Sequence, residues 1–79
     1  MIKLSRHVRN NMRLYRIAES DIIEAVRKPD RTLKEGMKSI ALKAMPKKFG
    51  GYSLKVVYEG SGDEITIITA YPLKRKEWR

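Results

Sequence analysis

The chain contains no cysteine and no glutamine, and its 79 residues include a single histidine, His7. Without cysteine, the protein can form neither a disulfide nor a thiolate metal site. One histidine and nine scattered acidic residues offer no recognisable cluster of metal ligands. The segment GSGD at 60–63 is too short for a phosphate-binding loop, and no serine stands in the motif of a nucleophile. We therefore expect neither a metal nor any other cofactor.

Long apolar segments are also missing. No apolar run approaches the roughly 20 residues that a membrane span needs, and the N-terminus lacks the apolar stretch of a secretory signal. Hydrophobic residues make up 42% of the chain and charged residues 34%, which is typical of a globular protein. The sequence thus predicts one small cytoplasmic domain over residues 1–79, with one core and no membrane association.

Basic residues dominate the charge. Eighteen Lys and Arg against nine Asp and Glu give a formal net charge of +9. A domain this basic should attract polyanions, and nucleic acid is the first candidate. An anionic membrane surface is the second candidate and an acidic protein the third, but the membrane is disfavoured because the apolar residues of the first predicted helix are needed for the core. The alternative is a solvated surface without a binding role, in a composition that resembles thermophilic proteins.

The first half of the chain is predicted to be helical. A helix over 5–16 places apolar residues on one stripe: Leu4, Val8, Met12 and Tyr15. A second stripe, which we call the arginine ridge, consists of Arg6, Arg9, Arg13 and Arg16. His7, Asn11 and Leu14 lie on the opposite flank of the apolar stripe. The histidine therefore borders the predicted core and is separate from the arginine ridge.

A second helix is predicted in ESDIIEAVRKPD, residues 19–30. Ser20 is the expected N-cap, and Asp21 suits the positive end of the helix dipole. The apolar face is formed by Ile22, Ile23 and Val26. Pro29 keeps Lys28 from helical backbone angles, so the helix should end there.

From Arg31 onward the apolar pattern has a period of two. A short strand, a turn at Glu35–Gly36 and a strand through residues 40–44 come first. YSLKVVYE and EITIITAY then flank GSGD, which predicts a hairpin. If Glu59 pairs with Glu64, the face toward the helices carries Tyr52, Leu54, Val56, Tyr58, Ile65, Ile67, Thr69 and Tyr71. The other face carries Ser53, Lys55, Val57, Thr66, Ile68 and Ala70.

This order of elements predicts an α+β fold. Two N-terminal helices should pack on one face of a three- to four-stranded antiparallel sheet. Pro72 should end the last strand, and LKRKEWR should follow it as a basic tail.

The chemistry that remains open to this composition is phosphodiester cleavage without a metal. It requires a base, an acid and cations that stabilise the charged transition state. His7 has the intrinsic pKa range for base or acid, Lys55 and Lys43 could supply positive charge, and Tyr71 could orient or protonate a group. The alternatives are structural: His7 as a histidine bonded to a carbonyl at the core boundary, the lysines as solvated strand residues, and Tyr71 as a core residue.

Two basic segments are candidates for binding nucleic acid. The arginine ridge has the spacing and the bidentate donors to follow a phosphate backbone, or it serves solubility alone. The tail residues Lys74, Arg75 and Lys76 are similar. Trp78 either stacks on a base or covers the sheet edge.

Several short motifs in order, SRHVRNNMRLYRI, SDIIEAVRKPD and ITIITAYP, resemble the prokaryotic family called domain of unknown function 4258. The resemblance covers nearly the whole chain. That family is similar in predicted fold to RelE-type toxins and to the barnase, EndoU and colicin ribonucleases. The resemblance implies two helices on a curved antiparallel sheet, with metal-independent RNA cleavage and an acidic antitoxin-like partner as expectations.

The family motifs can be carried over residue by residue. His7 occupies the position of the family histidine, residues 28–30 match the end of the second helix, and residues 69–72 match the terminal motif. The sequence departs from the family where Asn11 replaces an arginine before Met12, and where Tyr15-Arg16 replaces Arg-Gly. We therefore expect either a toxin-like endoribonuclease or a module that binds nucleic acid or an antitoxin without turnover.

Overall fold

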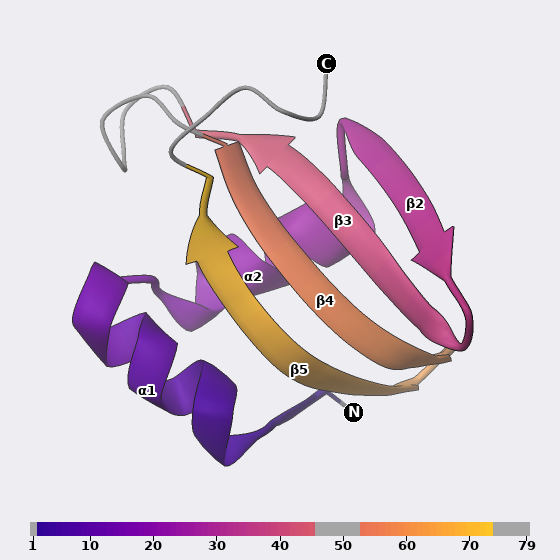
Figure 1. The fold of residues 1–79 in the computed structure, drawn as a ribbon, viewed down its shortest axis with the longest axis horizontal. Coiled ribbons are helices and arrows are strands. Elements are labelled where there is room, and N and C mark those ends of the chain that lie inside the picture. Colours follow the sequence, from indigo (N-terminus) through magenta and orange to yellow (C-terminus); the bar gives the residue numbers. More distant parts are fainter. Residues whose placement is uncertain (1, 46–52, 74–79) are drawn as a thin grey trace.

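The computed structural model describes residues 2–45 and 53–73. Their order along the chain is β1 (Ile2–Leu4), α1 (Arg6–Tyr15), α2 (Glu19–Arg27), β2 (Arg31–Glu35), β3 (Lys38–Ala44), β4 (Ser53–Ser61) and β5 (Glu64–Pro72) (Figure 1). Both helices, the β2–β3 pair and the β4–β5 hairpin lie where the sequence patterns predict them. The last strand ends at Pro72, as expected.

The sheet has five strands in the order β1-β5-β4-β3-β2. β1 runs parallel to β5, and the other neighbours are antiparallel. The α+β class is confirmed, but the prediction of a purely antiparallel sheet with three or four strands is wrong. β1 is not predicted from the sequence, because three residues are too few to show a period-two pattern and their partner strand lies some 60 positions away in the chain.

Hydrogen bonds fix where each helix begins. The Ser5 hydroxyl accepts from the amide of Val8 at 3.2 Å, which caps α1. α2 begins after Ala18, so the prediction of Ser20 as its N-cap is wrong. The Asp21 carboxylate instead accepts from the Ala18 amide at 3.0 Å, one turn back. α1 ends where Arg16 adopts a left-handed backbone, with φ 57°.

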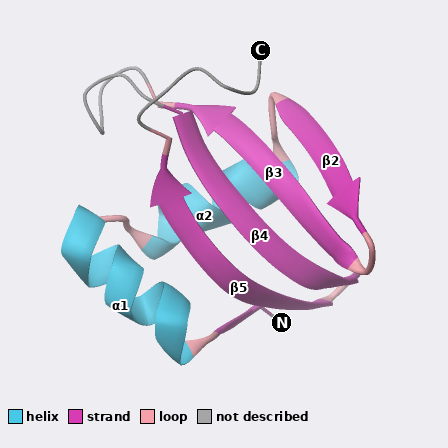
Figure 2. Cartoon of the chain, viewed as in Figure 1, coloured by secondary structure: helices cyan, strands magenta, loops and turns pink. Residues whose placement is uncertain are grey.

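Both helices pack against one face of the sheet to form a single core. In Figure 2, α1 lies along β5, and α2 crosses behind the central strands. The core cluster consists of Val8, Ile17, Ile22, Ala25, Ala41, Met45, Leu54, Val56, Ile67 and Ala70. We call the opposite side, which no helix covers, the open face.

A β-bulge in the β4–β5 hairpin changes which residues reach the core. Val57 pairs with Thr69, whereas Tyr58 pairs with Ile67, so Ile68 is an extra residue on β5. The expected pairing of Glu59 with Glu64 is also wrong, because Ser61 pairs with Glu64. A shift of two residues in the pairing would by itself leave every β5 side chain on its predicted face. The bulge adds one residue to β5, so the side chains beyond it lie on the opposite face.

The bulge therefore corrects the predicted faces of the last strand. Leu54, Val56, Tyr58, Ile65 and Ile67 face the helices as predicted. Beyond the bulge the pattern reverses: Ala70 is fully buried in the core, and Thr69 and Tyr71 lie on the open face. Tyr52, which was also predicted on the core face, lies outside the described residues.

A candidate site on the open face of the sheet

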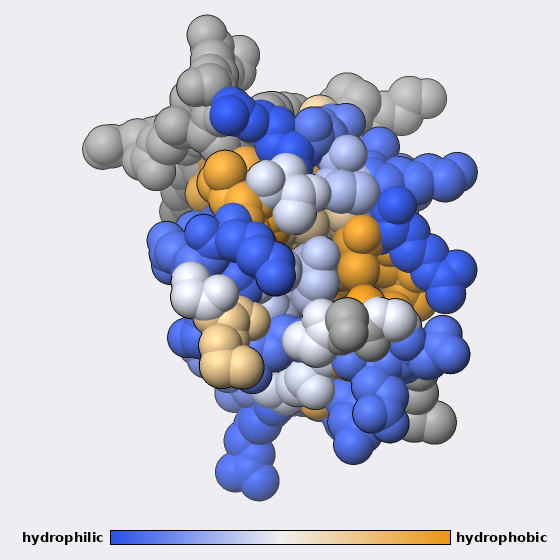
Figure 3. All heavy atoms as spheres, turned by 90° about the vertical axis from the view of Figure 1, so that its right-hand side faces the viewer, coloured by the Kyte–Doolittle hydropathy of each residue, from blue (hydrophilic) through white to orange (hydrophobic). Residues whose placement is uncertain are grey.

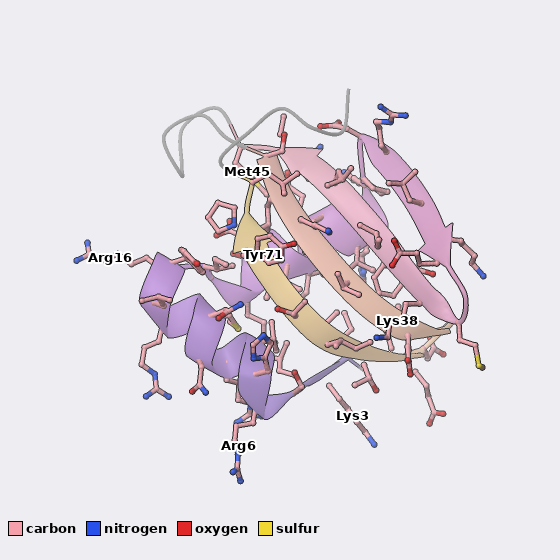
Figure 4. All side chains as sticks on the ribbon, in the orientation of Figure 1. Lys3, Arg6, Arg16, Lys38, Met45 and Tyr71 are labelled. Carbon is pink, nitrogen blue, oxygen red and sulfur yellow. The ribbon has the colours of Figure 1, made fainter. Side chains whose placement is uncertain are left out.

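Tyr71 lies on the open face near the C-terminal end of β5 (Figure 4), next to Lys55 of β4. They are opposite each other in the β4–β5 register, and the Lys55 Nζ atom lies 5.4 Å from the centroid of the Tyr71 ring. This is within the range of a cation–π contact. Both side chains are half-buried. Two of the three residues predicted to be catalytic are therefore in contact.

The surface beneath this pair is apolar. Leu42 is opposite Lys55 in the β3–β4 register, and Ile40 is opposite Val57. Leu42 is 1% exposed and Ile40 is 6% exposed, although no helix covers this face. Lys55 therefore has a buried apolar neighbour, Leu42, on the adjacent strand.

α1 lies along the edge of β5 beside this pair. The Asn11 amide donates to the Thr69 hydroxyl and to the Ala70 carbonyl, both at 3.2 Å. The Ser5 hydroxyl donates to the Ile68 carbonyl at 2.8 Å. The pairing of β5 with β1 ends at Ile67, and these hydrogen bonds satisfy polar groups of β5 after that residue. They fix the helix against the half of β5 that carries Tyr71.

His7 lies on the same flank of α1 as Asn11, one helical turn earlier. It is exposed, and within the described ranges it makes no hydrogen bond. The alternative of a histidine bonded to a carbonyl at the core boundary is therefore not what the structure shows. Because Asn11 reaches Thr69 on the open face, the flank that carries His7 borders the same face as Lys55 and Tyr71.

Lys43 does not join this group. It is opposite Leu54 in the β3–β4 register, so it lies on the helix side of the sheet. Its Nζ atom lies 4.0 Å from Glu24 and 3.9 Å from Asp30. Lys43 thus links α2 to the start of β2, and its charge is partly neutralised by these two carboxylates.

The arginine ridge lies on the other flank of α1. All four arginines are exposed. Arg9 and Arg13 line a shallow hollow of about 500 Å³ together with Leu4, Met12, Ile17 and Glu19. Arg6 and Arg16 extend outward from opposite ends of α1 (Figure 4). The ridge is thus a second basic surface, separated from Lys55 and Tyr71 by the body of the helix.

The remaining predicted residues, Lys74, Arg75, Lys76 and Trp78, lie outside the described residues. Within the described part of the chain, no group of three or more His, Cys, Asp or Glu is placed to hold a metal ion. Among the same residues, no helix is long and apolar enough to span a membrane.

Two residues of this site, Thr69 and Asn11, are not among the predicted site residues. The period-two pattern places Thr69 on the core face, and the helical pattern places Asn11 on the flank of His7 without giving it a contact. The apolar spacing of residues 64–72 carries no sign of the bulge that exposes Thr69. Asn11, by contrast, shares a helix flank with His7, and a polar amide at the border of an apolar stripe is a usable signal for a contact with a strand edge.

Comparison of the chain with protein-family models, with curated proteins and with solved structures finds no match.

Proposed function

We propose that this protein binds RNA on its open face and cleaves it without a metal ion, in the manner of toxin-type endoribonucleases with a RelE-like fold. The observation that carries the proposal is the contact between Lys55 and Tyr71 on the face that neither α1 nor α2 covers, beside the helix flank that presents His7. A base or acid, a hydroxyl and a cation at one edge are the groups that this chemistry needs.

Each group has a defined role in the proposed reaction. The neutral His7 imidazole takes the proton of a ribose 2′-hydroxyl, and the 2′-oxygen attacks the adjacent phosphorus. The bond from phosphorus to the 5′-oxygen breaks, and the Tyr71 hydroxyl donates its proton to that oxygen. The products are a 2′,3′-cyclic phosphate and a free 5′-hydroxyl. Lys55 stabilises the negative charge that develops on the phosphoryl oxygens.

The charge of the chain supports RNA as the substrate. The net charge of +9 attracts a polyanion to the protein. The arginine ridge is a second basic surface, outside the site at Lys55 and Tyr71, that a phosphate backbone can contact. Glutamine at Arg6, Arg9 and Arg13 should weaken binding and reduce the salt dependence of the affinity, by about one unit of slope for each lost phosphate contact. Unchanged salt dependence would remove the ridge from the proposal.

The test is a cleavage assay in EDTA on free RNA and on ribosome-bound message. His7→Ala should lower the rate by about 10²–10⁴-fold and leave RNA affinity nearly unchanged, because it removes a proton-transfer group. Tyr71→Phe should have an effect of the same kind. Lys55→Met should lower the rate as well, and Lys43→Met is its matched control, since it removes a lysine from the helix side of the sheet and should leave cleavage intact. Wild-type rates for His7→Ala, or no cleavage by the wild type, would refute the enzyme proposal.

A second candidate function is binding without turnover, to nucleic acid or to an acidic antitoxin-like protein. The observation that favours it is Asn11, which stands where the resembling family has an arginine and whose amide is engaged by Thr69 and Ala70. A binder would retain affinity for RNA or for the acidic partner while neither RNA substrate is cleaved. In that case His7→Ala would change neither the binding affinity nor the absence of cleavage.

A further inference from the structure

A large hollow among the described residues lies on the helix side of the sheet, away from the candidate site. Its volume is about 710 Å³, and α2 forms one of its walls. The other lining residues come from the ends of the strands. Apolar side chains on its surface are Ile2, Ile23, Val26, Tyr58 and Ile65, and charged ones are Glu19, Arg27, Lys34 and Asp63. Figure 3 shows apolar atoms open to solvent between hydrophilic side chains on the β2 side of the molecule.

One stripe of α2 lies along this hollow. Glu19, Ile23 and Arg27 are spaced four residues apart, so they stand one above another on the helix. Ile23 is half-buried but does not belong to the core cluster or to the apolar residues packed against it. Within the described part of the chain, neither Glu19 nor Arg27 makes an ion pair. The stripe therefore carries an acid and a base without an ion pair among the described residues, and between them an apolar residue outside the core cluster.

We propose that a second copy of this chain occupies the hollow, with the two α2 helices antiparallel about a two-fold axis at Ile23. Glu19 and Arg27 are equally far from Ile23, about 6 Å along the helix on either side. An antiparallel copy therefore places Glu19 of each protomer opposite Arg27 of its partner, and the two Ile23 side chains meet at the axis. This is the self-complementarity that a two-fold interface requires.

Charge complementarity favours this occupant over an acidic or a basic peptide. The rim carries two acids, Glu19 and Asp63, and two bases, Arg27 and Lys34, so a ligand of one sign would meet as much repulsion as attraction. The net charge of +9 on each copy opposes association, so the dimer is weak and reversible. The open face lies on the other side of the sheet from α2, so the site at Lys55 and Tyr71 remains accessible in the dimer.

The test is sedimentation velocity of the full chain from micromolar to millimolar concentration, with two charge reversals. The wild type should pass from monomer to dimer across this range. Glu19→Arg alone and Arg27→Glu alone should each weaken the dimer by about tenfold or more, because symmetry makes each substitution break two pairs. The double variant exchanges the charges and should restore dimerisation.

A matched control separates the interface from the helix itself. Ser20→Arg also places an arginine in the first turn of α2, where positive charge is unfavourable, but position 20 lies off the stripe and the variant should leave the dimer unchanged. Circular dichroism of every variant confirms that it is folded. A wild type that stays monomeric throughout, which would leave the hollow to a different partner, would overturn the proposal. So would a double variant that dimerises no better than the single ones.

Discussion

Asn11 offers a direct test of how α1 is attached to the sheet. Its amide makes two hydrogen bonds to β5, to the Thr69 hydroxyl and to the Ala70 carbonyl, both at 3.2 Å. An intramolecular hydrogen bond contributes roughly 0.5–1.5 kcal/mol net, and water can replace part of this at a half-buried position. Asn11→Ala should therefore lower the free energy of unfolding by about 1–2 kcal/mol.

The contribution of each bond can be separated in a double-mutant cycle. Thr69→Val removes one acceptor at nearly constant volume and should cost about 0.5–1 kcal/mol. In that background, Asn11→Ala should cost less than it does in the wild type, by about the value of the lost bond. Urea unfolding followed by far-UV circular dichroism measures all four proteins. A cost below about 0.3 kcal/mol for Asn11→Ala, or the same cost in both backgrounds, would refute this account.

Three further predictions concern the sheet. Gly60 has a φ of 101°, and a Cβ there would collide with the Glu64 backbone, so Gly60→Ala should lower the free energy of unfolding by about 2 kcal/mol or more. Gly62 has a φ of 61° with open space around it, so Gly62→Asn should lower the same quantity by less than about 1 kcal/mol. Asp30→Ala removes the carboxylate that accepts from a β3 amide at 2.7 Å and should cost about 1–2 kcal/mol in the same assay, while Asp30→Asn, which keeps an acceptor, should cost less. Tyr71→Leu should lose about 0.5–1 kcal/mol from the contact with Lys55, and an equal loss in a Lys55→Met background would show that the contact is not stabilising.

The corrections to the predicted fold share a physical cause. The helices and strands that were predicted correctly have local signals: a stripe at helical spacing, a proline that stops a helix, or alternating residues on either side of a glycine-containing turn. β1 and the bulge depend on contacts between residues far apart in the chain. Ile2 pairs with Ile65, and the bulge exists because Tyr58 pairs with Ile67 while Val57 pairs with Thr69. Neither pairing changes the local pattern of polar and apolar residues.

The amino-acid sequence by itself determined the α+β class, the bounds of most elements, the excess of positive charge and the separation of His7 from the arginine ridge. These follow from composition and from periodicity along one segment. The tertiary structure alone decided that Tyr71 and Lys55 share the open face, that Lys43 lies on the other side of the sheet, and that Asn11 ties α1 to β5. The reason is that a strand has no preferred face until its partners fix its register, and one inserted residue is enough to exchange its two faces.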